Sequence, residues 1–582
     1  MPVANLAVAA ALQEIADRLE IQGANAFRVR AYRAAARTVQ ELPDDVKAKV
    51  ERGETLAGMP GIGADLAGKI AEVATTGSCE VLRVLRHDMP PAITELLQIP
   101  GLCPKRVKTL WQELGVQSAD EVLRAAREQR IRALRGFGEI TEQRIEGAIA
   151  THLSKARRVK LTVAAEYADA LVRYLEAQPG VERVAVAGSF RRMRETVGDL
   201  DVLVVGKGGR AIAERFVAYP DVEQQLAIGA TKASVRLRSG LQVDLRIVAR
   251  ESFGAALVYF TGSKAHNIAL RKLGLAHGLK VNEYGVFRGT RRIAGETEAS
   301  VYAALGLPPI AAELREDQGE IVAAQAGALP RLVEYGDLAG DLHAHTNATD
   351  GRDTLEAMVE AARAAGLKYV AITDHSRRQA MSHGLDGAGL LRQARSIERV
   401  RRQASIDVLH GIECDILEDG SLDLPDDVLS RLDVVVAAVH GQFHLSRAKQ
   451  TERILRALDN RWVDVLAHPT GRLIGEREPY DVDMVAVVRK ARACGVHPEL
   501  NAHPDRLDLN EVNCRMCRDA GVRVAIDSDA HGVRGFDVLR LGVGQARRGW
   551  LTREDVVNTR TLAELRPLLR RSRNAHVTSR AA

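Results

Sequence analysis

Three aspartates in the middle of the chain are spaced so that they could hold metal ions together. Asp199 and Asp201 lie in GDLDVLVV, an apolar run typical of a β-strand, and alternate residues of a strand point to one face. Asp244 lies among apolar residues in a second expected strand, LQVDLRIV (241–248). Carboxylate oxygens suit two Mg²⁺ or Mn²⁺ ions, which can activate an attacking hydroxyl and steady a triphosphate. The three residues therefore predict a catalytic, two-metal nucleotidyl-transfer site.

A glycine, a serine and an arginine precede this pair. Gly188 and Ser189 end a short apolar strand, and Arg192 lies in the basic turn that follows it (ERVAVAGSFRRMRETVGDLD). Their amide, hydroxyl and guanidinium donors suit the phosphates of a nucleotide. Two aspartates at this spacing are common and often only cap a loop, but the whole order, ending in a distant strand aspartate, is far more specific. It resembles the nucleotidyltransferase superfamily, which also includes tRNA-end-adding enzymes and small-molecule adenylyltransferases.

Beyond residue 338, short apolar runs alternate with helical patterns, and most of the runs end in a residue that can bind a metal. Seven such βα units predict a distorted TIM-like barrel, whose strands bring their carboxyl ends to one rim. A single histidine at a strand end is usually structural, but the repetition favours a metal site, and imidazole with carboxylate suits Zn²⁺, Mn²⁺ or Fe²⁺. These residues are His343, His345, Asp374, His375, Glu413, His440, His468, Asp529 and His531.

Three segments of the N-terminal region each place a glycine-containing turn between helical patterns: 56–70, 96–111 and 134–149. Gly61, Gly63 and Gly101 permit a tight turn and leave the amides of the next helix open to a DNA phosphate. The pattern is typical of helix-hairpin-helix motifs, which grip the DNA backbone without reading sequence. A corner that serves packing alone is the alternative for any one copy. The second copy has Cys103 where glycine is usual, and the third, GFGEIT, fits least well.

Lys69 follows the first hairpin on an expected helix with apolar neighbours. Partial desolvation could lower the pKa of its amine, which could then attack an abasic sugar. The alternative is a lysine that only neutralises phosphate.

Composition excludes several classes of protein. The 582 residues are 46% hydrophobic and 27% charged, which is typical of globular chains with several domains. No apolar run reaches the ~20 residues that span a bilayer. The first residues predict an amphipathic helix and no signal peptide, and six cysteines in so long a chain favour a reducing cytoplasm. Cys514 and Cys517 are interpreted as packed helix residues.

Charge is distributed unevenly along the chain. Residues 1–315 hold 45 Lys+Arg against 36 Asp+Glu, whereas the remainder holds 37 against 40 and 12 of the 16 histidines. A basic first half suits a polyanion, and a histidine-rich second half suits metal. The two halves are expected to do different work.

The segment YFTGSKAHNIALRKLGLAHGLKVNEYGVF (259–287) resembles the nucleotide-selecting region of the DNA polymerase beta family, or family X. With the hairpins, the resemblance runs from about residue 5 to about residue 315. It implies lyase-like, fingers, palm and thumb subdomains in that order. It also implies that Tyr259, Phe260 and Gly262 line the sugar pocket of the incoming nucleotide.

The same resemblance implies further roles. Asn267 would contact the base edge, Arg271 the template minor groove, and Glu283 would belong to the network that closes the thumb. Lys69 matches the Schiff-base lysine of the family, while Asp65 stands where the family has a basic residue, which puts 5′-phosphate binding in doubt.

The metal-capable residues of the second half resemble the ligand set of the polymerase-and-histidinol-phosphatase (PHP) family over roughly residues 338–570. The family implies three ions. The first would take His343, His345, Glu413 and Asp529; the second Glu413, His440 and His468; the third Asp350, His375 and His531. A metal-activated water would attack a phosphate ester, and Arg472 could assist at the phosphate. His383, His410, His444, His497 and His503 are left as structural or peripheral, His503 being the strongest candidate among them.

The expected fold is multidomain, with helical helix-hairpin-helix domains, an α/β nucleotidyltransferase palm and thumb, and a distorted (β/α)7 TIM-like PHP barrel. The expected parts are a lyase-like domain (1–80), fingers (81–155), palm (156–248), thumb (249–315), linker (316–337), PHP domain (338–572) and tail (573–582).

The expected function is template-directed repair synthesis in short DNA gaps, with a 3′→5′ exonuclease or 3′-phosphoesterase in the PHP domain and possible nicking of abasic sites. Expected ligands are gapped or primer–template DNA, deoxynucleoside triphosphates, Mg²⁺ or Mn²⁺ in the palm and three Zn²⁺, Mn²⁺ or Fe ions in the barrel. The chain is expected to be a monomer away from membranes, in the cytoplasm near the nucleoid, and to meet other repair factors. Two alternatives stay open: a small-molecule phosphatase with a degenerate transferase, and a non-catalytic DNA-end scaffold.

Overall fold

The computed structural model describes residues 3–41, 46–59, 61–89, 93–94, 96–99, 101–156, 158–378 and 383–569. The tail expected at 573–582 lies outside these residues. The chain divides into two compact units, residues 1–157 and 158–582.

The first unit is helical and has two separate apolar cores. The first core, from Val8 to Leu85, and the second, which includes Ile93 and Ile149, are each lined by apolar side chains at helical spacing. Within the described residues no helix is long and apolar enough to cross a membrane. The helices are α1 (Val3–Gln22), α2 (Ala26–Glu41), α3 (Val46–Glu51), α4 (Ala64–Thr76), α5 (Glu80–Asp88), η1 (Leu96–Gln98), α7 (Pro104–Leu114), α8 (Ala119–Arg127) and α9 (Glu139–Ala156).

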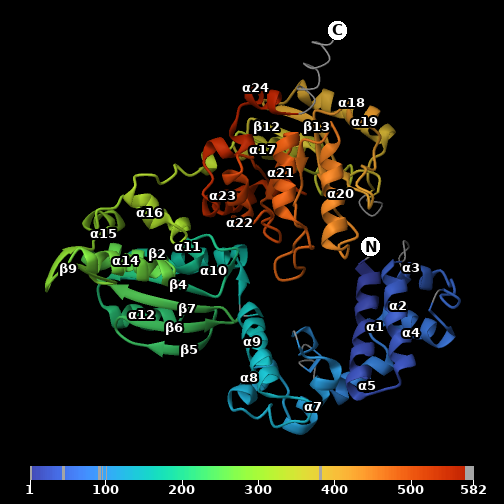
Figure 1. Cartoon of the computed structure of the whole chain (residues 1–582), viewed down its shortest axis with the longest axis horizontal. Helices are drawn as coiled ribbons and strands as arrows, with labels where there is room; N and C mark the ends of the chain where they lie inside the picture. Colours follow the sequence, from blue (N-terminus) through green and yellow to red (C-terminus); the bar gives the residue numbers. More distant parts are fainter. Residues whose placement is uncertain are drawn as a thin grey trace. The chain divides into compact units, whose positions relative to one another are not determined.

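The second unit begins with a five-stranded sheet of order β2-β4-β7-β6-β5, in which only β4 and β7 are parallel. Leu200, Val202 and Val204 point to one face, where they share a core with α10 and α12, while Leu203 and Val205 pack on α13 at the other. Figure 1 shows α12 against the strands, in green. The elements are β1 (Val159–Lys160), α10 (Leu161–Glu176), β2 (Val181–Val186), α11 (Gly188–Arg191), β3 (Thr196–Val197), β4 (Asp199–Gly206), α12 (Gly209–Val217), β5 (Val222–Ile228), β6 (Lys232–Leu237), β7 (Gln242–Val248), η2 (Arg250–Ser252) and α13 (Phe253–Thr261).

A small three-stranded antiparallel sheet, of order β10-β9-β8, follows with its own helices. Its core joins Leu270 and Val286 to Leu314 and Ile321 of the segment that leads toward the barrel. The elements are α14 (Lys264–Ala276), β8 (Lys280–Asn282), β9 (Gly285–Arg288), β10 (Arg291–Ala294), α15 (Glu298–Ala304), η3 (Ala312–Leu314), α16 (Glu320–Gln325) and η4 (Tyr335–Asp337).

The remainder forms a seven-stranded, fully parallel sheet in which every strand pairs with the next along the chain. A parallel bridge between Ala344 and Ala530 brings the first and last strands together, so the sheet curls into a nearly closed barrel with its helices outside (Figure 1). The strands are β11 (Gly340–Ala344), β12 (Tyr369–Ile372), β13 (Asp407–Asp415), β14 (Val434–Ala438), β15 (Val465–Leu466), β16 (His497–Asn501) and β17 (Ala525–Asp527). The helices are α17 (Leu355–Ala364), α18 (Gly387–Arg401), α19 (Asp426–Leu429), α20 (Arg447–Asp459), α21 (Met484–Cys494), α22 (Glu511–Asp519), η6 (Val533–Val538), α23 (Leu539–Arg548), η7 (Arg553–Asp555), η8 (Val557–Thr559), α24 (Leu562–Leu565) and η9 (Arg566–Leu568). The barrel expected from the alternating pattern is present.

Candidate active sites

The three central aspartates meet on two neighbouring strands. Asp201 of β4 lies directly opposite Asp244 of β7 in the parallel ladder, and Asp199 lies two residues before Asp201 on the same face. That face also carries Leu203 and Val205, which pack under α13. Strand pairing therefore gathers carboxylates that are up to 45 residues apart in the sequence.

The carboxylates raise each other's pKa values. Burial, and then Asp199 and Asp244, raise the pKa of Asp201 to about 7, while burial and Asp244 raise that of Asp199. The carboxylate of Asp244 accepts hydrogen bonds from Ser234 Oγ and, at 3.3 Å, from Gln242 Nε2. Crowded carboxylates of this kind are relieved by a cation, so the residues fit divalent metal ions.

The turn before β4 approaches these carboxylates closely. Gly188 has φ +66°, and a Cβ built on it would lie 2.7 Å from Asp201 Oδ2, so no other residue fits without displacing the carboxylate. The next residue, Ser189, has a buried Oγ that has no hydrogen-bond partner among the described residues. An unpartnered hydroxyl beside a carboxylate cluster is consistent with a bound polar group at this position.

Arg192 is engaged within the protein. Its guanidinium donates to Thr261 O at 2.6 Å and to Glu316 Oε1 at 2.9 Å. Neighbouring Arg191 makes a bidentate pair with Glu298, at 2.7 Å for each bond, and donates to Thr261 Oγ1. These bonds join the turn after β2 to the end of α13, and they use two of the five N–H donors of the Arg192 guanidinium.

The region expected to select the nucleotide forms one corner between α13 and α14. The rings of Tyr259 and Phe260 lie 5.1 Å apart, and Asn267 Nδ2 donates to Tyr259 O at 2.6 Å and Gly262 O at 3.1 Å. A Cβ on Gly262 would lie 3.0 Å from Asn267 Oδ1, so glycine keeps the corner tight. Arg271 lies on the exposed side of α14, donating to Asn267 O at 3.3 Å.

Glu283 lies between β8 and β9, half-buried and apart from this corner in the sequence. Its expected part in thumb closure stays a prediction.

The three glycine turns of the first unit share one geometry. Gly61, Gly101 and Gly136 have φ of +78°, +92° and +88°, and each is followed two residues later by the last residue before a helix (α4, α7 and α9). In each turn the residue after the glycine donates to the carbonyl three residues back, at 2.9, 3.0 and 3.1 Å. The third copy, expected to fit least well, therefore forms the same turn as the others.

The second position of the hairpin, held by Gly63 in the first copy and Cys103 in the second, does not need a left-handed backbone. Gly63 has φ −82° and ψ 173°, and Cys103 at the equivalent place has φ −88° and ψ 163°, which is extended backbone open to any residue. A Cβ on Gly63 would meet nothing within 4 Å. Glycine is thus not required there by the fold, and Cys103 is tolerated.

Lys69 does not have the lowered pKa that desolvation predicted. Burial alone would lower the pKa of Lys69, but its hydrogen bond to Asp65 and its interaction with Tyr32 raise it above the ordinary value. Its Nζ also lies over the Tyr32 ring, 5.8 Å from the centroid. The acidic residue that departs from the family pattern is the one that keeps this amine protonated.

In the barrel, Glu413 of β13 lies at the centre of the metal-capable residues. Its Oε2 faces His343 Nε2 at 3.5 Å and His345 Nε2 at 3.6 Å. Its Oε1 faces His440 Nε2 at 3.1 Å and His468 Nε2 at 3.0 Å. Its Oε2 also lies 2.8 Å from His375 Nδ1, a residue that the family set gives to the third ion. That Glu413 bridges two ions stays a prediction.

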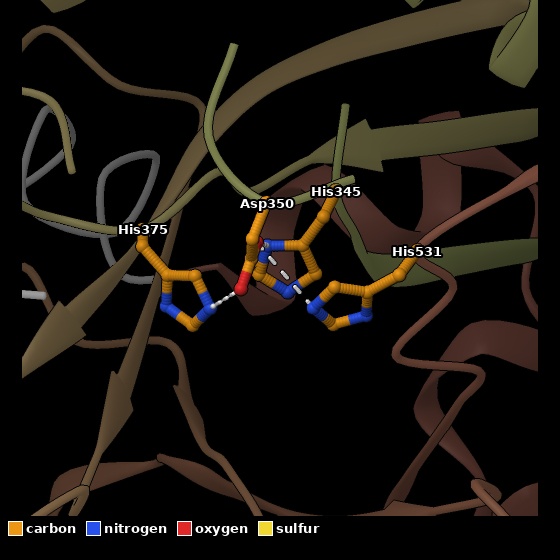
Figure 2. Close-up of side chains that lie close together, drawn as sticks. All are labelled: His345, Asp350, His375 and His531. Carbon is orange, nitrogen blue, oxygen red and sulfur yellow. Dashed lines mark ion pairs between the residues drawn. The ribbon is translucent and has the colours of Figure 1, made fainter. Parts of the chain in front are cut away.

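Asp529 and Asp350 complete two further groups. Asp529 Oδ1 lies 3.3 Å from His345 Nε2 and 3.7 Å from His343 Nε2. Figure 2 shows Asp350 between histidines that come from the ends of three strands, with 3.2 Å to His375 Nε2 and 3.5 Å to His531 Nε2. Several imidazole nitrogens here, including both of His345, are buried without a hydrogen-bond partner among the described residues. Such a donor set fits transition-metal ions.

The electrostatics of this centre also favour cations. Burial alone would raise the pKa values of Asp350, Glu413 and Asp529, but the surrounding histidines lower all three. Burial alone would lower the pKa values of His375 and His440, but the nearby Glu413 carboxylate raises them to about 10 and about 9. Burial lowers the pKa values of His345 and His468 to about 3. The carboxylates are held in their ionised form, and the histidines share a small number of protons. Metal cations can take the place of these protons.

Two carboxylates that orient the histidines were missed in the sequence. Glu499 Oε1 lies 2.6 Å from His343 Nδ1, and its Oε2 accepts from His468 N at 2.7 Å. Asp415 Oδ1 lies 2.6 Å from His440 Nδ1. A carboxylate behind a metal-facing imidazole fixes the orientation of the ring. Asp415 could have been predicted, because it lies two residues after Glu413 and therefore on the same face of the strand. No comparable spacing pointed to Glu499.

Two expected residues are used elsewhere. Arg472, expected at the phosphate, instead donates to Arg506 O at 2.9 Å and to Leu507 O, and pairs with Glu195 at 2.7 Å. Asp374 accepts from Thr346, Thr349 and Gln393 and is fully buried, so it shapes the rim. Cys514 and Cys517 are buried residues of α22, as interpreted.

The folds and sites define a nucleotidyltransferase joined to a PHP-type barrel with clustered residues that could bind metal ions. Family models match the DNA polymerase beta thumb at 256–316, the helix-hairpin-helix domain at 3–79, the SAM-like helix-hairpin-helix tandem at 93–145 and the PHP domain at 341–476. The chain is 35% identical over 569 residues to "DNA polymerase/3′-5′ exonuclease PolX" of Bacillus subtilis, covering 96% of this chain and 98% of that protein. It belongs to the family X DNA polymerases that carry a PHP domain.

Other relatives match parts of the chain. DNA polymerase lambda of Rattus norvegicus is 26% identical over 339 residues, which is 52% of this chain and 55% of that protein. A probable phosphatase of Acetivibrio thermocellus is 32% identical over 200 residues, 33% of this chain and 78% of that protein. The two halves thus have separate relatives.

Proposed function

We propose that this chain extends DNA from a template in its palm and removes nucleotides from DNA 3′ ends in its barrel. The observation that carries the proposal is the presence, in one compact unit, of two separate carboxylate centres, one around Asp201 and one around Glu413. The near full-length likeness to a polymerase/3′-5′ exonuclease supports the pairing of the two activities.

In the palm, Asp199, Asp201 and Asp244 hold two Mg²⁺ or Mn²⁺ ions. When bound, such ions would supply an activated primer 3′ hydroxyl and neutralise the triphosphate as its pyrophosphate leaves. Gly188 and Ser189 bind the phosphates, and Arg192 joins them through the remaining N–H donors of its guanidinium. Tyr259, Phe260 and Gly262 shape the sugar pocket, with Asn267 toward the base, Arg271 toward the template and Glu283 in thumb closure.

In the barrel, three groups of side chains would hold Zn²⁺, Mn²⁺ or Fe ions, and Glu413 would contribute to two of these groups. Bound ions supply an activated water and stabilise charge on the phosphate under attack. Glu499 and Asp415 keep the imidazoles of His343 and His440 oriented toward the centre. Abasic-site nicking in the barrel is a further activity of the same repair role. Lyase chemistry at Lys69 is another, and it requires the amine to lose the proton that Asp65 stabilises.

The substrate is gapped or primer–template DNA with deoxynucleoside triphosphates, as in base-excision repair. The hairpins at Gly61, Gly63 and Gly101 hold the DNA backbone through helix amides. We further propose that the chain acts as a monomer close to the nucleoid, alongside other repair factors. The domain boundaries at residues 80, 155, 248, 315, 337 and 572 serve as the limits for fragments.

The test is primer extension and 3′-end trimming on a one-nucleotide-gapped duplex with Mn²⁺. It compares the wild type, the double variant Asp199→Ala/Asp201→Ala and the double variant His343→Ala/His345→Ala. The first variant should lose only extension and the second only trimming. If the wild type extends nothing while the barrel hydrolyses a small phosphate ester, the proposal fails and the phosphatase alternative replaces it. The three aspartates, which lie together as an intact group, speak against that alternative.

A further inference from the structure

A loop between β16 and α22, residues 503–508, brings an arginine to the barrel centre. Arg506 Nε lies 3.6 Å from Asp529 Oδ2, too far for a good hydrogen bond, and among the described residues no other carboxylate pairs with it. Asp529 already accepts from Asn501 Nδ2 at 2.9 Å and faces His343 and His345. The Arg506 side chain is 20% exposed, and its guanidinium therefore places a positive charge at the site while most of its N–H donors stay available to a ligand.

The palm holds this loop from the outside by charged contacts. Lys160 of β1 donates to Asp505 Oδ1 at 2.5 Å and to Glu476 Oε1 at 3.0 Å. Arg472 pairs with Glu195 of the palm and donates to the carbonyl oxygens of Arg506 and Leu507. The first contact holds the side chain next to Arg506, and the second links the backbone of Arg506 and Leu507 to Glu195 of the polymerase half.

An apolar anchor completes the support. Leu507 is 1% exposed and belongs to the core of the palm, where it packs in the same cluster as residues of α10 and β4. Its φ of +40° is left-handed and costs a leucine energy, so the surroundings must impose it. The side chain of Leu507 thus lies in one half of the unit while its neighbour Arg506 faces the active site of the other.

We propose that Arg506 binds the phosphate of the DNA 3′ end in the barrel site and that the palm positions it through Leu507 and Lys160. This inference rests on the proposed phosphoesterase function of the barrel. A planar guanidinium matches two phosphate oxygens at once and keeps its charge at every working pH. It lies next to the metal-capable residues yet competes with none of them, because it has no lone pair to give to a cation. It also takes the role that Arg472, buried between the halves, cannot take.

The experiment compares full-length Arg506→Gln, Arg506→Lys, Leu507→Ala and Lys160→Ala with the wild type. Arg210→Ala is the matched control, because Arg210 makes an exposed pair with Glu214 (2.8 Å) on α12 of the palm, away from the loop. Each protein, loaded with Mn²⁺, is titrated with thymidine 5′-monophosphate by calorimetry. Bound Mn²⁺, exonuclease kinetics and primer extension are measured on the same samples.

Arg506→Gln should bind the nucleotide roughly 10- to 100-fold more weakly and raise the exonuclease KM, since a hydrogen bond to a charged group is lost. It should keep its Mn²⁺, and Arg506→Lys should restore part of the affinity. Leu507→Ala should weaken binding roughly tenfold, because small misplacement of a binding group is costly. Lys160→Ala should have a smaller effect in the same direction, with extension intact in both.

Unchanged nucleotide binding in Arg506→Gln, or loss of Mn²⁺ from it, would overturn the role of Arg506. Weakened binding in Arg506→Gln but normal binding in Lys160→Ala and in a folded Leu507→Ala would overturn positioning by the palm. Exonuclease activity that persists in His343→Ala/His345→Ala would instead sink the proposed function itself, so the two failures are distinguishable.

Discussion

Replacing Asp201 by asparagine should make the metal-free palm more stable while abolishing primer extension. Burial and the carboxylates of Asp199 and Asp244 raise the pKa of Asp201 from 3.8 to about 7. Between these two pH values the folded chain therefore holds more protons than the unfolded chain, and its stability falls as the pH rises. Above pH 7 the ionised carboxylate is fully present, and asparagine, which has nearly the same shape, removes it.

The size of the effect follows from the shift. Each pKa unit corresponds to about 1.4 kcal/mol, so a shift of roughly three units gives about 4 kcal/mol as an upper limit at pH 8 and about a third of that at pH 5. The gain should vanish when Mg²⁺ is added to the wild type, because the ions then stabilise the carboxylates that they bind.

Hydrogen–deuterium exchange in EDTA measures this locally, on peptides that cover β4 and β7. Protection in Asp201→Asn should exceed that of the wild type at pH 8 and approach it at pH 5. Glu214→Gln, on exposed α12 of the same palm, is the control and should not change protection at either pH. Equal protection of Asp201→Asn and wild type at pH 8 would refute the idea that the carboxylates destabilise the empty site.

Three further predictions concern the hairpins, the lysine and the metal requirement. Gly61→Ala should cost about 1–2 kcal/mol of stability because its φ of +78° is left-handed, whereas Gly63→Ala should fold normally and weaken DNA binding in a gel-shift titration; equal stability losses would contradict this. Asp65→Ala should lower the pKa of Lys69 and, because the pair is exposed, increase borohydride trapping on an abasic site only about two- to threefold. Reduced trapping would instead show that Asp65 assists the lysine. The Mg²⁺ concentration for half-maximal primer extension should rise up to about tenfold per pH unit below 7, because protons compete for Asp201; a flat profile from pH 7.5 to 6 would argue against this.

The sequence pattern predicted the carboxylate pair well because strand geometry is local. Alternation places Asp199 and Asp201 on one face whatever the rest of the chain does. The same holds for the barrel, since repeated strand–helix units with ligands at the strand ends lead to one rim. The turn at Gly136 was expected to fit the hairpin pattern least well because its sequence, GFGEIT, differs from the other two. Its left-handed glycine and the start of the next helix are nevertheless spaced as in those hairpins.

Side-chain partners across the fold could not be predicted in this way. The residue beside Lys69 was recognised as acidic, but only the structure shows that Asp65 raises the pKa of the amine. Arg472 was expected at the phosphate, yet it is held by Glu195, 277 positions earlier in the chain. Glu499 carries no local signal, because its contact with His343 depends on strands that are far apart in the chain.

By itself, the sequence determined the types of chemistry in this protein: hard carboxylates in the palm, imidazole with carboxylate in the barrel, and glycine turns for a polyanion. These follow from residue type and from the periods of strand and helix, which act over a few residues. Only the tertiary structure decided which oxygen of Glu413 faces which histidines, and that the palm supports the loop of Arg506. Such contacts arise from packing between distant segments, where a shift of one ångström changes the partner, and no local pattern encodes them.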